Sequence, residues 1–334
     1  MTTLYQERLA LFADNSRQTN KIFKWRSVQV NRLAALLFAL EDRAVEGDEL
    51  HNSYALIKDS TGPFSMFRGN SAISISALLS LTQDPKHILT QTMEVYDLMK
   101  ASKFRTSDYL VVAAYQIAAH TQPDQYKYTV ERAKAFYDRM KQSRRFQTSQ
   151  DDYIFASMLA LSGVDVESCG DRMDRLYEAL KPQLPFRSGN SIQALTQVLA
   201  LGESDESTSV SRVLELRDIF REQGLRMDKE YTLPSLGILS LLPSEIESIT
   251  TDIVESYNYL RTEKGFSGWS ITQPELLLLC AALVASEHLK NARGGTLLTT
   301  AAATSITNIV IAQQTALAMA AAIAASSAAS SSSH

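Results

Sequence analysis

The stretch Tyr96-Asp97-Leu98-Met99-Lys100, followed by Phe104-Arg105, decides the fold, because versions of it return along the chain. In each version an aromatic residue, or once Arg, is followed three positions later by an apolar residue and four positions later by a base. The copies begin at residues 54, 96, 137, 177, 217 and 257, and a turn with Phe or Leu follows each one. The copies are thus spaced about 40 residues apart, and a fixed period of this length is typical of stacked supersecondary units.

Each unit of the repeat is predicted to be a pair of helices. The segment 171–181, which contains the copy that begins at 177, has apolar residues at Met173, Leu176, Tyr177 and Leu180, which form one stripe along a helix. The partner segments, such as 110–119, carry no charge on any side, as is typical of helices that are surrounded by protein. Because strand patterns are essentially absent, we predict an all-α protein built from helical hairpins of about 40 residues.

These hairpins could close into an α/α toroid or continue as an open α-solenoid. A solenoid usually exposes polar residues on its concave face, whereas a ring buries its inner helices from both sides. The charge-free segments therefore favour the toroid, with residues 1–295 as a single helical-hairpin repeat domain. Residues 296–334 are predicted to be an Ala-rich uncharged C-terminal helix followed by a Ser tail.

The C-terminal segment 296–329 contains no Asp, Glu, Lys or Arg. Its Ala-rich composition favours a helix, which could enter a bilayer, pack against the charge-free helices, or form a self-association surface or loose tail. It is long enough to span a membrane, but Asn308, Gln313 and Gln314 oppose that environment. We therefore expect packing within the lumen in preference to membrane contact.

Composition limits the classes of partner and compartment. A net charge of -4 gives no electrostatic support for nucleic-acid binding. The two cysteines, Cys169 in an expected turn and Cys280 in a charge-free helix, imply no disulfide framework. The N-terminus has no apolar core of the length that secretion signals need, so the expected location is cytoplasmic.

The sequence contains no motif that carries recognisable chemistry. It has no His or Cys pair with metal-ligand spacing and no Gly-rich phosphate loop, so we expect no catalytic residues, metal or cofactor. Asp151, Asp152 and Glu275 are interpreted as helix caps, and Trp269 as a core residue. The favoured function is a non-catalytic binding or scaffold protein with a protein partner or self-association.

The alternative function rests on four arginines. Arg68, Arg105, Arg187 and Arg226 each follow the Phe or Leu of a turn. In a closed ring these turns would share one rim, where guanidinium groups and helix N-termini could bind a small anionic ligand. That arrangement would suit a small-molecule binder or enzyme. Otherwise each Arg ties down its own helix end, or pairs with Asp108, Asp228 or Glu230.

Three parts of the sequence carry a family resemblance. They are Phe23-Lys24-Trp25, the run from Tyr96 to Phe104 with the segment that follows at 107–119, and the Ala-rich end. Together they resemble an uncharacterised bacterial family of about this length, known only as a domain of unknown function. The resemblance implies an all-helical bacterial protein and brings no catalytic residues.

Overall fold

The computed structural model describes residues 3–229 and 232–293, and every regular element in them is helical. These residues form fourteen α-helices and two short 3-10 helices without a strand, which confirms the predicted all-α class. The described chain divides into two compact units, one of residues 6–131 and the other of residues 3–5 and 132–293. We call them unit 2 and unit 1, respectively, and describe each by itself. The predicted single domain 1–295 stays a prediction.

Unit 2 contains most of the first seven helices along the chain. Their bounds are α1 (Thr3–Ile22), α2 (Val28–Leu40), α3 (Gly47–Ser60), α4 (Ala72–Ser80), α5 (Pro85–Ala101), α6 (Asp108–His120) and the start of α7 (Tyr126–Ser143). The 3-10 helices Met66–Arg68 and Pro123–Gln125 lie in its turns. α1 is the longest of these α-helices, with 20 residues that run without a break to Ile22.

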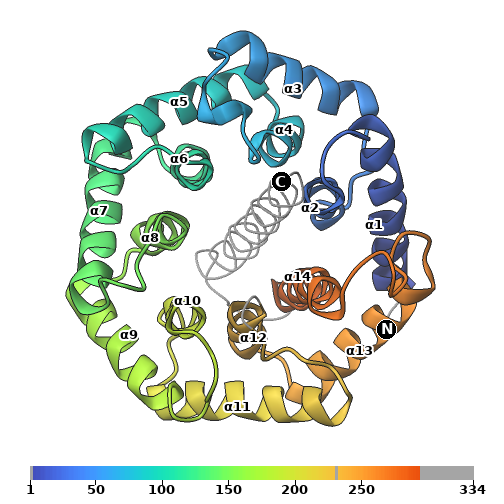
Figure 1. The fold of residues 1–334 in the computed structure, drawn as a ribbon, viewed down its shortest axis with the longest axis vertical. Helices are drawn as coiled ribbons and strands as arrows, with labels where there is room; N and C mark the ends of the chain where they lie inside the picture. The colour runs from blue at the N-terminus through green and yellow to red at the C-terminus, as the bar shows by residue number, and fades with distance from the viewer. Residues whose placement is uncertain (1–2, 230–231, 294–334) are drawn as a thin grey trace, which may run out of the picture. The chain divides into compact units, whose positions relative to one another are not determined.

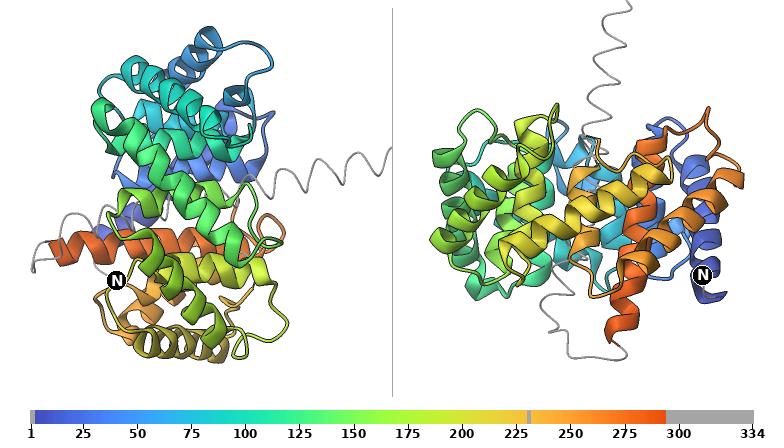
Figure 2. Two further views of the ribbon diagram at one scale, coloured as in Figure 1. Left: turned by 90° about the vertical axis from the view of Figure 1, so that its left-hand side faces the viewer. Right: turned by 90° about the horizontal axis from the view of Figure 1, so that it is seen from below.

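Unit 1 contains the rest of α7 and the helices that follow it. These are α8 (Asp152–Leu161), α9 (Val166–Leu180), α10 (Gly189–Leu199), α11 (Glu206–Glu222), α12 (Leu233–Ser240), α13 (Ile246–Thr262) and α14 (Gln273–Arg293). Cys169 was predicted to lie in a turn, and this is wrong: it is buried inside α9, which begins three residues earlier. Figure 2 shows α14 extending past the ends of the other helices of unit 1.

Within each unit the even-numbered helices form one layer and the odd-numbered helices a second layer (Figure 1). The even-numbered helices are poor in charge and largely buried; α12, for example, is buried at every position from Leu233 to Ser240. The odd-numbered helices are amphipathic, and α9 buries Met173, Leu176 and Tyr177 on one face. The charge-free segments are therefore buried, as their composition predicted.

The Tyr and Lys of the repeated motif contact each other. The Lys100 ammonium lies 5.4 Å from the centre of the Tyr96 ring, and Lys181 lies 5.6 Å from that of Tyr177. Residues four apart share one helix face, so the cation can reach the ring within its own helix. This contact was not predicted from the sequence.

A second recurring contact fixes the turns that follow even-numbered helices in unit 1. Arg132, Arg172 and Arg212, spaced forty residues apart on odd-numbered helices, donate to backbone carbonyls of the next turn. The distances are 2.6 Å to the Val164 oxygen, 2.5 Å to that of Ser204 and 3.0 Å to that of Leu242. Arg132 and Arg212 also donate from Nε to the carbonyls of Ala160 and Ser240, which lie in the last turns of α8 and α12 and have no intrahelical partner.

The last hairpin of unit 1 departs from this pattern. Forty residues after Arg212 the chain has Asp252, whose carboxylate lies 2.8 Å from His288 Nε2 on α14. The other ring nitrogen, Nδ1, lies 2.7 Å from Ser244 Oγ. Because α14 continues where the other even-numbered helices end, a side-chain contact takes the place of the Arg–carbonyl contact. This inter-helix contact was not predicted from the sequence.

No helix in the described residues combines the length and the apolar character needed to cross a bilayer. The predicted C-terminal helix at 296–329 lies outside those residues, so its environment stays a prediction.

Candidate functional site

The structure distributes the four predicted arginines between the two units. Arg68, in unit 2, donates from Nε to Thr61 Oγ1 at 3.2 Å and from its guanidinium to the carbonyls of Lys58 and Thr61. It therefore caps the end of α3, which is the alternative that the sequence analysis left open. Arg105, also in unit 2, is exposed in the turn before α6. The neighbouring Asp108 accepts from Ser71 at 2.9 Å.

Unit 1 brings Arg187 and Arg226 together on one carboxylate. Arg187 Nη2 lies 3.0 Å from Asp228 Oδ2, and Arg226 Nε lies 3.0 Å from Oδ1. Arg221, at the end of α11, completes the group with Nη2 2.6 Å from Oδ2. We call these four residues the Asp228 cluster. Asp228 was one of the partners that the sequence suggested, whereas Arg221 was not predicted as a member.

Local backbone structure places each member of the Asp228 cluster. Gly224, with φ of +71°, turns the chain after α11, and the N–H of Leu225 bonds to the Phe220 carbonyl at 2.8 Å. This is the arrangement of a helix C-terminus closed by a left-handed residue. Arg187 directly precedes Ser188, which caps α10 by accepting from the Ser191 N–H. Two helix ends therefore direct their arginines to the turn between α11 and α12.

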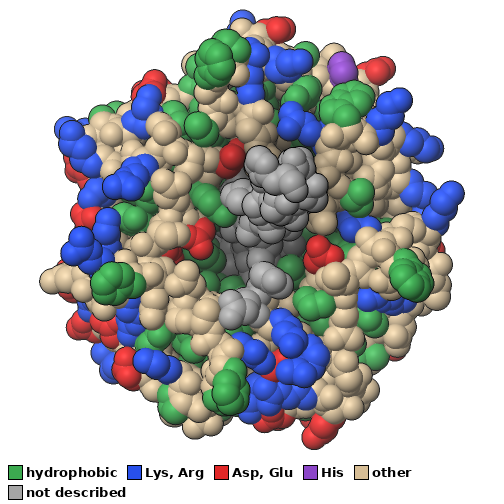
Figure 3. All heavy atoms as spheres, in the orientation of Figure 1, with side chains coloured by type: hydrophobic (Ala, Val, Ile, Leu, Met, Phe, Trp, Pro, Cys, Tyr) green, Lys and Arg blue, Asp and Glu red, His purple; other side chains and the backbone are tan. Residues whose placement is uncertain are grey.

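The Asp228 cluster carries an excess of positive charge. Three guanidinium groups surround one carboxylate that is 0% exposed. Asp218 approaches Arg221 to 3.6 Å but also pairs with Arg217, so this outer pair leaves the balance unchanged. The side chains of Arg221 and Arg226 are 42% and 45% exposed. In the lower part of Figure 3, Lys and Arg side chains gather near α11 and α12.

The arginines determine the protonation of Asp228. Burial raises the pKa of its carboxyl, but hydrogen bonds from Arg226, Arg221 and Arg187 outweigh burial and hold the pKa well below its ordinary value. The carboxylate is thus ionised at neutral pH and neutralises one of its three partners. The remaining two positive charges are available to an anion that reaches the exposed side of the cluster.

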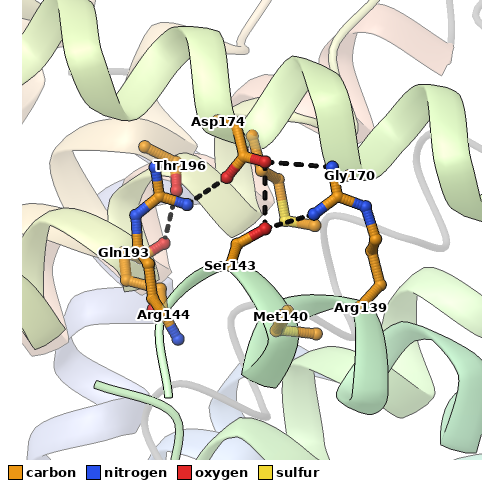
Figure 4. A pocket seen from close by; sticks show the side chains of 9 residues that line it. Arg139, Met140, Ser143, Arg144, Gly170, Asp174, Gln193 and Thr196 are labelled. Carbon is orange, nitrogen blue, oxygen red and sulfur yellow. Dashed lines mark hydrogen bonds and ion pairs between the residues drawn. The ribbon is translucent and has the colours of Figure 1, made fainter. Parts of the chain in front are cut away.

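A second group of arginines in unit 1 has the opposite balance (Figure 4). Arg139 of α7 and Arg144 of the following turn both contact Asp174 of α9, with Arg139 Nη2 2.9 Å from Oδ2. Gly170 leaves room for Arg139, because a Cβ there would lie 2.6 Å from Nε. Three further acidic residues lie within 4 Å of these two arginines: Glu167, Asp171 and Glu178. Acid outnumbers base, so this group joins α7 to α9 and is not suited to binding an anion.

Asp152, interpreted from the sequence as a cap, is a buried carboxyl among amides. Its Oδ2 accepts from the Ser149 N–H at 2.7 Å, which is the expected capping contact. Its Oδ1 accepts from Gln197 Nε2 at 2.5 Å and from Gln193 Nε2 at 3.1 Å. Burial and the nearby charge of Asp151 raise the pKa of Asp152 to about 7. Because the amides are neutral, the charge pattern of the sequence does not reveal this cluster.

The two cysteines and Glu275 lie where they contribute to the fold. Cys169 and Cys280 are both buried, and burial raises the pKa of the Cys169 thiol to about 11. Glu275 closes the capping box of α14, accepting from the Thr272 N–H at 3.0 Å. Within the residues that the structure describes, no three His, Cys, Asp or Glu side chains are arranged to hold a metal ion.

Comparison with known proteins identifies a family for the chain. No curated protein and no solved structure matches the chain. A family model, described as protein of unknown function (DUF4003), matches residues 15–316 of the 334. The resemblance that the sequence suggested to an uncharacterised family is thereby confirmed, and the chain belongs to the DUF4003 family.

Proposed function

We propose that the protein is a helical-hairpin binding protein whose Asp228 cluster takes an anionic group, carboxylate or phosphate, from a partner or small molecule. The observation that carries this proposal is the convergence of three guanidinium groups on one fully buried carboxylate. Guanidinium groups recognise carboxylate and phosphate through paired charge-assisted hydrogen bonds. Binding is favoured over a purely structural role because two of the three arginines keep more than 40% of their surface exposed.

The scaffold that would present this site is proposed to be the closed toroid. Charge-poor helices that are buried at nearly every position support it, because an open solenoid would expose one face of its inner layer. A contact inside unit 1 supports it as well. The hydroxyl oxygens of Tyr5 and Ser256 lie 2.6 Å apart although the residues are 251 positions apart in sequence.

Small-angle scattering tests the toroid. A compact 334-residue chain should have a radius of gyration of about 20 Å, whereas an extended solenoid of equal length should exceed that clearly. A value well above the compact estimate for monomeric protein would contradict ring closure and leave the Asp228 cluster as a site on an open solenoid.

Calorimetric titration with inorganic phosphate and pyrophosphate tests the anion site. Arg226→Gln should weaken binding about tenfold, because it removes a half-exposed charge and its hydrogen bonds. Arg175→Gln is the matched control, since Arg175 is 60% exposed on α9 and pairs with Glu206 outside the cluster. Equal affinities for wild type and the Arg226 variant, or no binding of either anion, would contradict the proposal.

A further inference from the structure

The most exposed aromatic side chains of the described chain share one structural position. They lie in the turns that lead from an odd-numbered helix to the next even-numbered helix, which we call odd-to-even turns. Their exposed fractions are Trp25 63%, Phe64 95%, Phe146 99%, Phe186 96% and Trp269 101%. Trp269 had been interpreted as a core residue, and its full exposure shows that this was wrong. Figure 3 shows hydrophobic side chains standing out singly among basic and polar ones.

The odd-to-even turns are also basic. Between the helix ends they contain twelve Lys and Arg residues and four Asp and Glu residues. The even-to-odd turns, at the opposite ends of the hairpins, contain one Arg and nine acidic residues. The chain as a whole is acidic, so the two sets of turns separate its charge to opposite ends of each unit's hairpins.

Helix capping accounts for part of the acidic set, whereas in the basic set Arg68 caps the end of α3 and Arg144, Arg187 and Arg226 pair with carboxylates. Asp84, Asp165 and Asp205 cap odd-numbered helices by accepting backbone N–H groups. Three even-numbered helices, α2, α6 and α10, begin instead with serine caps at Ser27, Ser107 and Ser188. A cation in an odd-to-even turn lies between a helix C-terminus that favours it and an N-terminus that does not. Helix dipoles therefore give no net reason for a basic surface there.

The backbone holds one of these aromatics outward at a cost. Phe186 has φ of +66°, a conformation that disfavours side chains with a Cβ, and its ring is 96% exposed. Burial cannot offset this strain in the isolated protein. Non-glycine residues in this region of φ are concentrated at functional sites, where the conformation serves binding.

From these observations we infer that the odd-to-even turns of each unit dock on an anionic lipid bilayer. The aromatic rings enter the headgroup region, and exposed bases of the same turns, among them Lys24, Lys103 and Arg145, contact lipid phosphate or carboxylate groups. Aromatic rings at the membrane–water interface and basic residues facing anionic lipid are the two features such contact requires.

The spacing of the aromatics favours a bilayer over a folded protein partner. Protein interfaces concentrate their binding energy in a contiguous, well-packed centre. Here the five rings lie in five separate turns, and four of them are at least 95% exposed. A fluid surface accepts such separate insertions without needing a matching pocket for each one. This binding mode needs neither the Asp228 cluster nor the segment 296–329.

The chain supplies its own reporters for a test. It contains two tryptophans, Trp25 and Trp269, and both lie in odd-to-even turns. Full-length protein is mixed with vesicles of phosphatidylcholine alone or of phosphatidylcholine and phosphatidylserine in equal parts. Co-sedimentation and a blue shift of tryptophan fluorescence are expected with the anionic vesicles, and both should weaken as salt is raised.

The decisive variant is Phe64→Ala/Phe146→Ala/Phe186→Ala, which keeps both tryptophans. Each ring that no longer enters the interface should weaken vesicle binding roughly tenfold, so the triple variant should lose at least about a hundredfold. The matched control is Tyr128→Ala, an aromatic side chain that is 58% exposed on α7 outside these turns, and it should bind as wild type does.

Four outcomes would overturn the inference. They are no co-sedimentation with anionic vesicles, equal binding to neutral vesicles, undiminished binding of the triple variant, and binding to polyglutamate without a fluorescence shift on vesicles. The third would assign membrane contact to another segment, and the fourth would identify an acidic polypeptide as the partner. Phosphate titration of the Asp228 cluster is read separately, so either proposal can fail alone.

Discussion

Asp152 and Asp228 are both buried carboxyls in unit 1, yet their partners move their pKa values in opposite directions. Asp152 is 5% exposed and accepts from two amides and a backbone N–H, whereas Asp228 is 0% exposed and accepts from three guanidinium groups. Burial raises the pKa of both. Amide donors leave that effect dominant at Asp152, while the arginines reverse it at Asp228. The charges beside each carboxyl therefore separate the two pKa values, with Asp151 next to Asp152 and three arginines around Asp228.

Removing the carboxylate of Asp228 should give the largest effect. Asp228→Ala leaves three guanidinium groups close together and should lower the free energy of unfolding by about 3 kcal/mol at neutral pH. The loss should shrink below about pH 4, because a depressed folded-state pKa contributes stability above the unfolded pKa and loses it as pH falls. Urea denaturation at several pH values measures both effects.

The control for this change is Asp218→Ala, because Asp218 is an exposed carboxylate that pairs with Arg217. Its side chain is 53% exposed, so the loss should stay below about 1 kcal/mol. If the two variants lose equal free energy of unfolding, burial of the Asp228 ion pairs contributes nothing to stability. If the Asp228 cluster binds anions, added phosphate should restore part of the stability of Asp228→Ala.

Replacing Asp152 should remove a pH dependence of stability that has the opposite sign to that of Asp228. Between an unfolded pKa of about 3.9 and the folded pKa of about 7, the folded state holds a proton that the unfolded state has lost. Stability from this group therefore falls as pH rises through that window, by at most about 1.4 kcal/mol per pH unit. Asp152→Asn cannot ionise and should lack this slope, so its stability should exceed that of wild type at about pH 8. Parallel stability curves from about pH 4 to 8 would exclude a raised pKa at Asp152.

A smaller change sharpens the role of the amides. Gln197 is fully buried, and Gln197→Glu keeps its shape while placing a second carboxyl 2.5 Å from Asp152 Oδ1. Two carboxyls at that distance share a proton, so the upper pKa of the pair should rise by about one unit or more above 7. The loss of stability with rising pH should then extend to higher pH. Gln193→Glu, at 3.1 Å, is the milder comparison.

The two carboxyls also show how far the sequence could predict the molecule. Helix positions followed from the spacing of apolar residues, and Asp228 was named as an Arg partner because opposite charges lay in turns of the same kind. Arg221 was missed because it lies in the last turn of α11, where the helix dipole alone would favour a base. The Gln193 and Gln197 amides gave no signal, since neutral side chains four apart on a buried helix resemble core spacing. Whether Trp269 is exposed depends on which residues pack over its turn, and the amino-acid composition does not show this.

The smallest predicted effect concerns the turn that positions Arg187 on Asp228. Phe186→Gly removes a side chain from a backbone with φ of +66°, where glycine is not strained. Relief of the strain should exceed the extra entropy that glycine gains in the unfolded chain, giving a net gain of about 0.5–1 kcal/mol. Phe146→Gly is the matched control, because Phe146 is 99% exposed and its φ is not positive, so glycine should be neutral or destabilising there. If both variants lose stability equally, the Phe186 ring stabilises the turn itself, and the strain argument for its outward position fails.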